Sequence, residues 1–237
     1  MLYRIADFNI DIEPRSQRLL EMCEPYRCDT AAEADFVVRT SDQDIRDEKS
    51  RDTQSGGEQP RPAFYEQISV YRKICAYALA HDAFLMHCAV IEYEGRGYAF
   101  SAPSGTGKTT HIKLWQQVFG EDKVTIVNGD KPILRALDGE IYAYGTPWSG
   151  KEGYNANTRV PLRGLCFLER GAENSIRRIT PEEAVPYLFG QIMISDSTNL
   201  SRQMELVDLL LQKVPCYRLA CNMNAEAAHV AYSGIKE

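Results

Sequence analysis

The sequence predicts an α/β protein, because short apolar runs typical of strands alternate with segments of helical periodicity. Two features carry this prediction. Apolar residues recur at helical spacing over residues 64–80, where Phe64, Ile68 and Tyr71 fall on one face. Near the middle of the chain, an apolar run at 97–101 leads into a glycine-rich loop and a second helical segment. At 237 residues and 44% hydrophobic content, the chain is long enough to bury a core.

The first sixty residues predict a small α+β segment. Its expected elements are one or two strands at 2–12, a helix at 15–25 and a strand at 34–39. Residues 41–62 are almost wholly polar and can bury little apolar surface, so a loop or linker is expected there. We therefore predict a small N-terminal α+β segment over 1–62 that ends in a polar linker (41–62), followed by a main domain over 63–237.

The main domain is expected to begin with the helix at 64–80 and to continue with strands and helices in mixed order. Its expected strands lie at 84–91, 97–101, 124–127, 133–135, 140–144, 162–168 and 216–220. Its later helices are expected at 111–118, 181–193, 200–213 and 225–233. The stretch 145–158 is polar and rich in Gly, Asn and Ser, which predicts a long loop.

The glycine-rich loop carries the most specific pattern in the chain. It reads Ala102-Pro103-Ser104-Gly105-Thr106-Gly107-Lys108-Thr109, followed by Thr110, which is the pattern GxxxxGK[ST] with alanine first. Glycines let backbone N–H groups turn onto phosphate oxygens, and the helix N-terminus adds partial positive charge. We expect residues 104–110 to bind the phosphates of a nucleotide, with Lys108 on the β- and γ-phosphates and the Thr109 hydroxyl on Mg²⁺. The alternative is a glycine-rich turn that binds nothing.

A carboxylate follows the next apolar strand. Asp130 ends the segment Asn128-Gly129-Asp130, directly after the strand expected at 124–127. A Walker-B carboxylate has the same place relative to a phosphate-binding loop and holds Mg²⁺ directly or through water. The pattern therefore favours a functional role for Asp130, and the alternative is an ordinary turn aspartate.

His87 lies on the strand that precedes the loop strand. A hairpin turn centred on Gly95-Arg96, with Glu94 opposite Gly97, would bring His87 level with Ser104 at the mouth of the phosphate-binding loop. That position suits a metal ligand, a phosphate contact or a proton carrier. The alternative is a core histidine on a strand, and a register slip of one residue would turn the side chain away.

The long polar loop supplies a third candidate. Lys151 stands among glycines with a tryptophan, a glutamate and a tyrosine nearby, a composition typical of a substrate-contacting loop. Arg159 and Arg163 follow and could bring positive charge to a transferring phosphoryl group. For each of these residues the alternative is a solvated surface side chain.

Composition argues against several classes of partner. The formal net charge of −6 does not suit nucleic acid or an anionic membrane surface. No apolar run is long enough to span a bilayer, and the N-terminus lacks the anatomy of a signal peptide. Seven dispersed cysteines indicate reduced thiols in a cytoplasmic protein. The sequence does not determine the oligomeric state.

Three blocks together resemble the phosphoenolpyruvate carboxykinase/HPr kinase superfamily. They are Met86-His87-Cys88-Ala89, Ser104-Gly105-Thr106-Gly107-Lys108-Thr109-Thr110 and Asn128-Gly129-Asp130. A weaker likeness to small HPr-kinase-related proteins continues over 162–170. The resemblance implies a P-loop core of the phosphoenolpyruvate-carboxykinase type, with a mixed, strongly twisted sheet. It also implies Mg²⁺ or Mn²⁺ near Thr109, His87 and Asp130, and phosphoryl transfer from a nucleotide.

The sequence departs from that superfamily at an informative place. Lys131 stands where relatives have the second acid of a pair, so Asp130 is left as the single carboxylate of this segment. No counterpart of the oxaloacetate-binding segments or of the C-terminal signature of HPr kinases is found, so decarboxylation and HPr are not expected. The chain resembles most the small relatives that phosphorylate free serine or a serine hydroxyl on a peptide.

These expectations combine into a Mg²⁺-dependent kinase that uses ATP or ADP and a small-molecule or peptide hydroxyl acceptor. Lys108, Asp130, His87 and Lys151 are its predicted catalytic residues. The alternative is a nucleotide-binding switch without phosphotransfer, which Lys131 would favour. A structural protein with a vestigial loop is a further alternative, against which the intact Lys108 and Thr109 argue.

Overall fold

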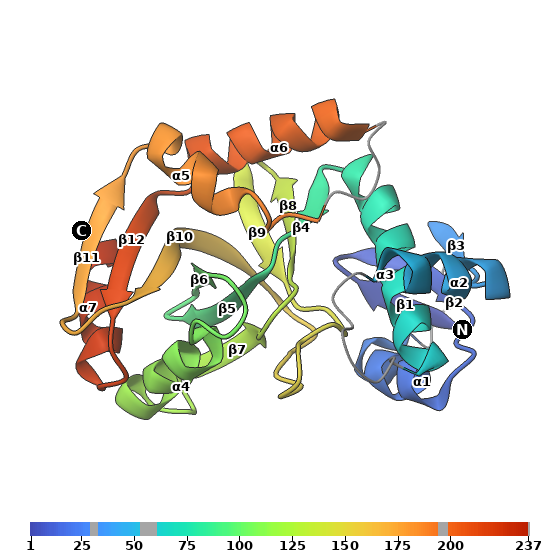
Figure 1. The fold of residues 1–237 in the computed structure, drawn as a ribbon, viewed down its shortest axis with the longest axis horizontal. Helices are drawn as coiled ribbons and strands as arrows, with labels where there is room; N and C mark the ends of the chain where they lie inside the picture. The colour runs from blue at the N-terminus through green and yellow to red at the C-terminus, as the bar shows by residue number, and fades with distance from the viewer. Residues whose placement is uncertain (29–32, 53–60, 194–198, 237) are drawn as a thin grey trace.

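The computed structural model describes residues 1–28, 33–52, 61–193 and 199–236. The chain begins with a three-stranded sheet and its helices, at the blue end of Figure 1. The elements are β1 (Leu2–Ile5), β2 (Phe8–Ile12), α1 (Gln17–Cys23), the 3₁₀ turn η1 (Glu24–Tyr26), β3 (Phe36–Val38), α2 (Asp42–Arg51) and α3 (Pro62–Leu79). β1 pairs antiparallel with β2, and β3 lies parallel to β2 at the other edge. The α+β character predicted for this part is therefore present.

The rest of the chain builds a nine-stranded sheet with helices on both faces. Its strands are β4 (Ala83–Leu85), β5 (Cys88–Tyr93), β6 (Arg96–Ser101), β7 (Val124–Asn128), β8 (Ile133–Leu137), β9 (Glu140–Tyr144), β10 (Arg159–Arg170), β11 (Ser175–Ile179) and β12 (Cys216–Cys221). Its helices are α4 (Lys108–Phe119), α5 (Pro181–Leu188), α6 (Leu200–Lys213) and α7 (Glu226–Lys236). Seven strands follow the order β4-β8-β9-β10-β6-β5-β7, and β12 joins at β10 with β11 beyond it. The predicted α/β fold is confirmed.

The long strand β10 makes this sheet mixed and curled. Its first residues pair antiparallel with β9, and its later residues pair parallel with β6 on one side and with β12 on the other. The register shifts between Leu162 and Gly164, and such an irregularity bends a strand and increases its twist. A Cβ at Gly164 would lie 2.7 Å from the Ile235 side chain of α7, so glycine allows the close approach of this helix.

Alternate side chains of the strands divide the core into two layers. On one face, Cys88, Val90 and Phe167 pack with α5 and α6. On the other face, Ala89 and Ile91 pack with apolar residues of α4 and α7. Figure 1 shows α5 and α6 above the sheet and α4 and α7 below it. This arrangement follows from the period of two along a strand, which sends successive side chains to opposite faces.

Strand directions bring four chain segments to one edge of the sheet. β5 runs antiparallel to β6 and to β7, so its start lies beside the ends of both neighbours. β10 runs parallel to β6, so its end lies at the same edge. His87 just before β5, the glycine-rich loop after β6, Asp130 after β7 and Arg170 at the end of β10 therefore converge on this edge.

Three expectations about individual elements were wrong. Residues 42–51 of the expected linker form the helix α2, which begins with a capping box of Ser41 and Asp44 and is tied to α3 by the buried Glu48. Because α2 buries so little apolar surface, periodicity could not reveal it. The strand expected at 84–91 is two strands, because the chain changes partners between β4 and β5. The helix expected at 181–193 ends at Leu188, and Gly190 follows with a positive φ of 79°.

The boundary placed between residues 62 and 63 stays a prediction. One core cluster contains side chains from the first three strands, from α3 and from β4, β8 and β9, so the two parts share a core. Within the described residues, none of the helices combines the length and the apolar character needed to cross a membrane.

Candidate functional site

The glycine-rich loop connects β6 to α4, as the motif predicts. Gly105 and Gly107 have φ values of 80° and 124°, which side-chain-bearing residues rarely adopt. Gly107 is the N-cap of α4, and no acidic side chain occupies the first turn of this helix. No side chain of that turn therefore neutralises the partial positive charge of the helix N-terminus. An anionic ligand would be stabilised there.

Lys108 is the first residue of α4 and is only 7% exposed. Its Nζ donates a hydrogen bond to the carbonyl oxygen of Ala102 at 2.8 Å, so the side chain folds back across the loop. Burial lowers the pKa of Lys108, and the nearby negative charge of Asp130 opposes that shift. A buried ammonium group with a carbonyl as partner would gain from an anionic ligand.

His87 and Asp130 meet at the mouth of this loop. Nε2 of His87 donates a hydrogen bond to Oδ1 of Asp130 at 3.0 Å, and Lys131 forms an ion pair with Oδ2. Burial by itself raises the pKa of Asp130, but the hydrogen bond from His87 and the charge of Lys131 outweigh it and lower the pKa to about 2. Asp130 is thus an ionised carboxylate at any physiological pH.

The hairpin that carries His87 turns one position earlier than expected. Its central residues are Glu94 and Gly95, with φ values of 53° and 73°, and Tyr93 pairs with Arg96. Both central residues of such a two-residue turn need positive φ, and glycine supplies the second at no cost. The expectation of a turn centred on Gly95 and Arg96 was therefore wrong by one residue.

The earlier turn moves His87 by two residues along the neighbouring strand. Cys88 lies opposite Ser101, so His87 is level with Ala102 and not with Ser104 as expected. Because side chains alternate along a strand, a shift of two residues leaves the His87 side chain on the predicted face. The imidazole therefore still reaches the mouth of the glycine-rich loop, where it meets Asp130.

The turn that carries Asp130 is held by two fully buried polar residues whose role the sequence did not reveal. Oδ1 of Asn128 accepts hydrogen bonds from the backbone N–H groups of Asp130 at 2.9 Å and Lys131 at 2.7 Å. The Asn128 amide donates to the carbonyl and hydroxyl oxygens of Thr146, and the Thr146 hydroxyl donates to the carbonyl of Lys131 at 2.7 Å. The order Asn-Gly-Asp is the sequence signal for such a turn.

The loop 145–158 packs against this turn. Gly150 has a φ of 82°, and a Cβ at this position would lie 3.2 Å from Cβ of Asp130. Trp148 anchors the loop, because its Nε1 donates to the carbonyl of Gln67 in α3 at 3.2 Å. The exposed Lys151 follows Gly150 directly, so the structure places its backbone near Asp130.

The two arginines that follow the loop are engaged elsewhere. Nη1 of Arg159 pairs with Oδ2 of Asp7 in the N-terminal part at 2.6 Å. Arg163 donates to the carbonyl of Lys236 at the end of α7. These contacts hold the two guanidinium groups away from the glycine-rich loop, which corrects the expectation that they bring charge to a phosphoryl group there.

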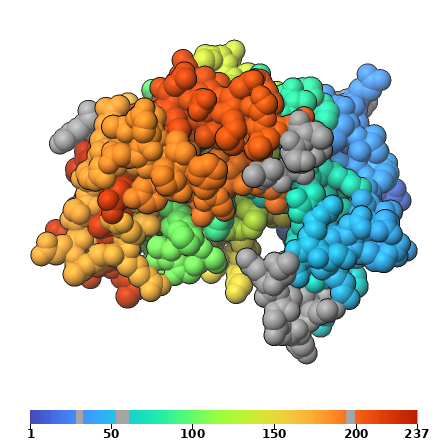
Figure 2. All heavy atoms as spheres, turned by 45° about the horizontal axis from the view of Figure 1, so that its top comes forward, coloured from blue at the N-terminus to red at the C-terminus, as the bar shows by residue number. Residues whose placement is uncertain are grey.

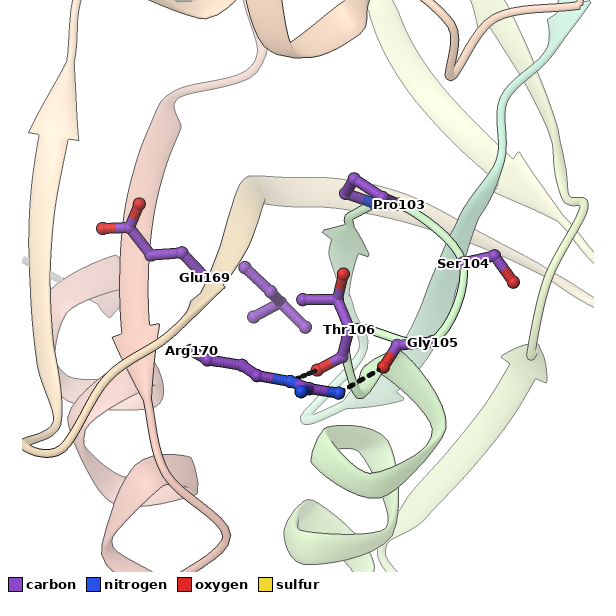
Figure 3. A pocket seen from close by; sticks show the side chains of 7 residues that line it. Pro103, Ser104, Gly105, Thr106, Glu169 and Arg170 are labelled. Carbon is purple, nitrogen blue, oxygen red and sulfur yellow. Dashed lines mark hydrogen bonds between the residues drawn. The ribbon is translucent and has the colours of Figure 1, made fainter.

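A pocket of about 440 Å³ opens beside the glycine-rich loop. It is lined by Pro103, Ser104, Gly105, Thr106, Leu168, Glu169 and Arg170. Arg170 reaches across from the end of β10 and donates to the carbonyl oxygens of Gly105 at 2.7 Å and Thr106 at 3.4 Å, as Figure 3 shows. In the same figure Glu169 points away from the loop, and its carboxylate pairs with Arg218. Sequence reasoning did not assign Arg170, because its strand partner β6 lies far away along the chain.

The remaining predicted phosphate ligands lie on the open side of the site. Ser104 and Thr110 are exposed, and Thr109 is half-buried in the first turn of α4. Figure 2 shows the green segment that includes the loop reaching the surface between the orange and the yellow segments. The glycine-rich loop is therefore accessible to a ligand from this face.

A divalent cation would find few protein ligands here. Among the residues that the structure describes, no three His, Cys, Asp or Glu side chains are placed to hold a metal ion. Asp130 and the Thr109 hydroxyl supply hard oxygen donors, which suit Mg²⁺ when phosphates and water complete its shell. The donor set therefore fits a metal that arrives with a nucleotide. Nε2 of His87 is directed at Asp130, so the role of His87 as a metal ligand stays a prediction.

Comparison with protein-family models gives no match to this sequence. Comparison with curated proteins gives none either. Among solved structures, the chain is similar to the HPr(Ser) kinase/phosphatase from Coxiella burnetii, with 8% sequence identity and a TM-score of 0.38. That match covers 64% of this chain and 88% of the other. So loose a likeness carries no function over to this chain.

Proposed function

We propose that this protein is a Mg²⁺-dependent phosphotransferase. It moves a phosphoryl group from ATP or ADP to a hydroxyl of a small molecule or peptide, and serine is the first acceptor to test. One observation carries the proposal: His87 and Asp130 are hydrogen-bonded to each other at the edge where β6 enters the loop of Lys108. We also propose that the fold around this loop is a P-loop core of the phosphoenolpyruvate-carboxykinase type.

The chain's own residues would act by position and charge. The loop N–H groups and Lys108 bind the terminal phosphates, and Lys108 exchanges its bond to the Ala102 carbonyl for a phosphate oxygen. Asp130 accepts a hydrogen bond from the attacking hydroxyl, and His87 fixes the direction of that carboxylate. The oxygen–phosphorus bond to the nucleotide breaks as the bond to the acceptor oxygen forms. The hydroxyl proton passes by way of Asp130 to water.

Asp130 and Thr109 would hold the metal ion, which supplies charge neutralisation for the phosphates. The loop 145–158 would contact the acceptor, because Gly150 packs on Asp130 and Lys151 stands next to it. The glycines at 150 and 153 have positive φ values, which give this loop two backbone positions where few other residues fit. Lys151 is thus the proposed contact to an anionic acceptor group.

A second function is favoured by one observation. Lys131 pairs with Asp130, so the carboxylate is partly neutralised before any ligand arrives. A protein of this kind could bind a nucleotide as a switch and transfer no phosphoryl group. The two functions differ in a single measurable step, the appearance of phosphate on a hydroxyl compound.

The test is a radiolabelled phosphate-transfer assay with ATP and ADP. Acceptors are free serine, free threonine, small hydroxy acids and serine-containing peptides. Wild type is run beside Lys108→Ala and Asp130→Asn, with Lys123→Ala as a control, because Lys123 is exposed beyond the far end of α4. We expect transfer in wild type and the control and its loss in the two site variants. Equal transfer in all four proteins would refute the assignment, and nucleotide binding without transfer would support the switch.

A further inference from the structure

Positive charge exceeds negative charge around Asp130. Lys131 forms an ion pair with this carboxylate, His87 donates to it, and the buried ammonium group of Lys108 lies near it with a neutral carbonyl oxygen as its hydrogen-bond partner. Two ammonium groups therefore share a single counter-charge at the mouth of the glycine-rich loop. An anion that entered here would meet an uncompensated positive charge, and the site would attract it before any metal ion took part.

The backbone of Lys131 is held in place by hydrogen bonds to two buried side chains. Its N–H donates to Oδ1 of Asn128 at 2.7 Å, and its carbonyl accepts from the Thr146 hydroxyl at 2.7 Å. Asn128 and Thr146 are both fully buried. The Lys131 side chain itself is 37% exposed, so its backbone is fixed by buried partners while part of its side chain is in contact with solvent.

The ion pair with Asp130 does not use all the hydrogen-bond donors of the Lys131 ammonium group. An ammonium group has three N–H donors, and one carboxylate oxygen takes one of them. The N–H groups beyond the one on Asp130 can donate to an incoming phosphate oxygen. Lysine binds phosphate as a point charge and needs no fixed approach direction, which suits a phosphoryl group that changes shape during transfer.

We propose that Lys131 binds the terminal phosphate of the nucleotide directly, alongside the metal ion that Asp130 and Thr109 would hold during phosphoryl transfer. This inference rests on the proposed nucleotide binding. It implies that the protein binds ATP measurably in the absence of any divalent ion, through Lys108 and Lys131 together. The competing interpretation is that Lys131 only neutralises Asp130 and never contacts the ligand.

Calorimetric titration separates the two interpretations. ATP and ADP are titrated into wild type, Lys131→Ala, Lys131→Arg and Lys123→Ala, first in excess chelator and then in Mg²⁺. Without metal, we expect Lys131→Ala to weaken ATP binding about tenfold, from the loss of one charge-assisted contact. Lys131→Arg should keep most of the affinity, Lys123→Ala should match wild type, and the loss should be smaller for ADP, which ends one phosphate earlier.

A charge reversal gives a second measurement. Lys131→Asp places a second carboxylate beside Asp130, so its ATP binding should vanish in chelator and return with Mn²⁺, whose binding is read by electron paramagnetic resonance. Thermal unfolding confirms that each variant is folded. ATP binding that is equal in wild type and Lys131→Ala without metal would overturn the inference, as would wild-type binding that requires Mg²⁺. A wild type that binds no nucleotide in either condition would instead refute the proposed function.

Discussion

Nε2 of His87 lies 3.0 Å from Oδ1 of Asp130, although His87 precedes β5 and Asp130 follows β7. The contact depends on strand direction, because β5 is antiparallel to β7 and the start of one strand adjoins the end of the other. The two side chains also depend on each other. His87 helps to keep Asp130 ionised in a partly buried place, and Asp130 gives the imidazole a fixed partner.

The first prediction concerns the pH dependence of stability. The pKa of Asp130 is lowered to about 2 in the folded protein, below the ordinary value of 3.8. A lowered pKa stabilises the folded state above the unfolded pKa, and this stabilisation is lost as the pH falls through the folded pKa. Asp130→Asn should therefore lower the free energy of unfolding at pH 7 by about 1–2 kcal/mol, a figure reduced for partial solvent exposure.

Urea denaturation of wild type and Asp130→Asn at about pH 7, 4 and 2.5 measures this effect. The difference between the two proteins should be constant from about pH 7 to 4 and should shrink between about pH 4 and 2. Asp138→Asn is the control, because Asp138 lies in the hairpin turn between β8 and β9, away from the site. A difference that stays unchanged down to the lowest pH would show that ionised Asp130 contributes nothing to stability.

The second prediction separates backbone strain from ligand binding. Gly107 and Gly139 have φ values of 124° and 82°, and at neither position would an added Cβ meet another atom within 4 Å. Alanine at either position should destabilise the fold by about 1–3 kcal/mol through backbone strain. Only Gly107→Ala should also abolish nucleotide binding, since Gly107 shapes the loop and Gly139 turns a distant hairpin. Thermal unfolding and ATP titration of both variants check this, and equal ATP affinity in the two would contradict it.

The third prediction tests the contact between the loop 145–158 and Asp130. Gly150→Ala puts a methyl group 3.2 Å from Cβ of Asp130, whereas Gly153→Ala in the same loop meets nothing within 4 Å. Both glycines have positive φ, so the backbone strain is matched. Phosphotransfer by Gly150→Ala should fall about tenfold below that of Gly153→Ala, because the carboxylate is displaced. Similar rates in the two variants would show that the contact between this loop and Asp130 does not affect phosphotransfer.

Some of this site could be predicted from the sequence, because the signals are local. The Glu94-Gly95 turn joins β5 directly to β6, so pairing of these strands followed from a few adjacent residues. The predicted register was wrong by two residues. The His87 side chain is nevertheless on the predicted face of the sheet, because side chains alternate with a period of two. The motif likewise placed Lys108 at the start of a helix.

The rest of the site depends on pairing between distant segments. β6 pairs with β10 across a long intervening stretch, and no turn residue signals that partnership, so Arg170 could not be placed beside Gly105. Asn128 and Thr146 come together only when β7 and β9 end side by side. The helix α2 was missed for another reason, since a capping box and the buried Glu48 with its ion pairs replace an apolar face there.

The last prediction concerns Arg170, which fixes the glycine-rich loop from outside. Its guanidinium group donates to the carbonyl oxygens of Gly105 and Thr106, so it restrains two peptide groups of the loop. Arg170→Ala should weaken ATP binding about three- to tenfold, since these contacts are exposed to solvent. Arg177→Ala is the matched control, because Arg177 also pairs at the surface but with Glu183, far from the loop. Arg170→Lys should recover only part of the loss, because an ammonium group cannot span both carbonyls as a planar fork does. If Arg170→Ala bound ATP as tightly as Arg177→Ala, the loop would hold its shape without help from β10.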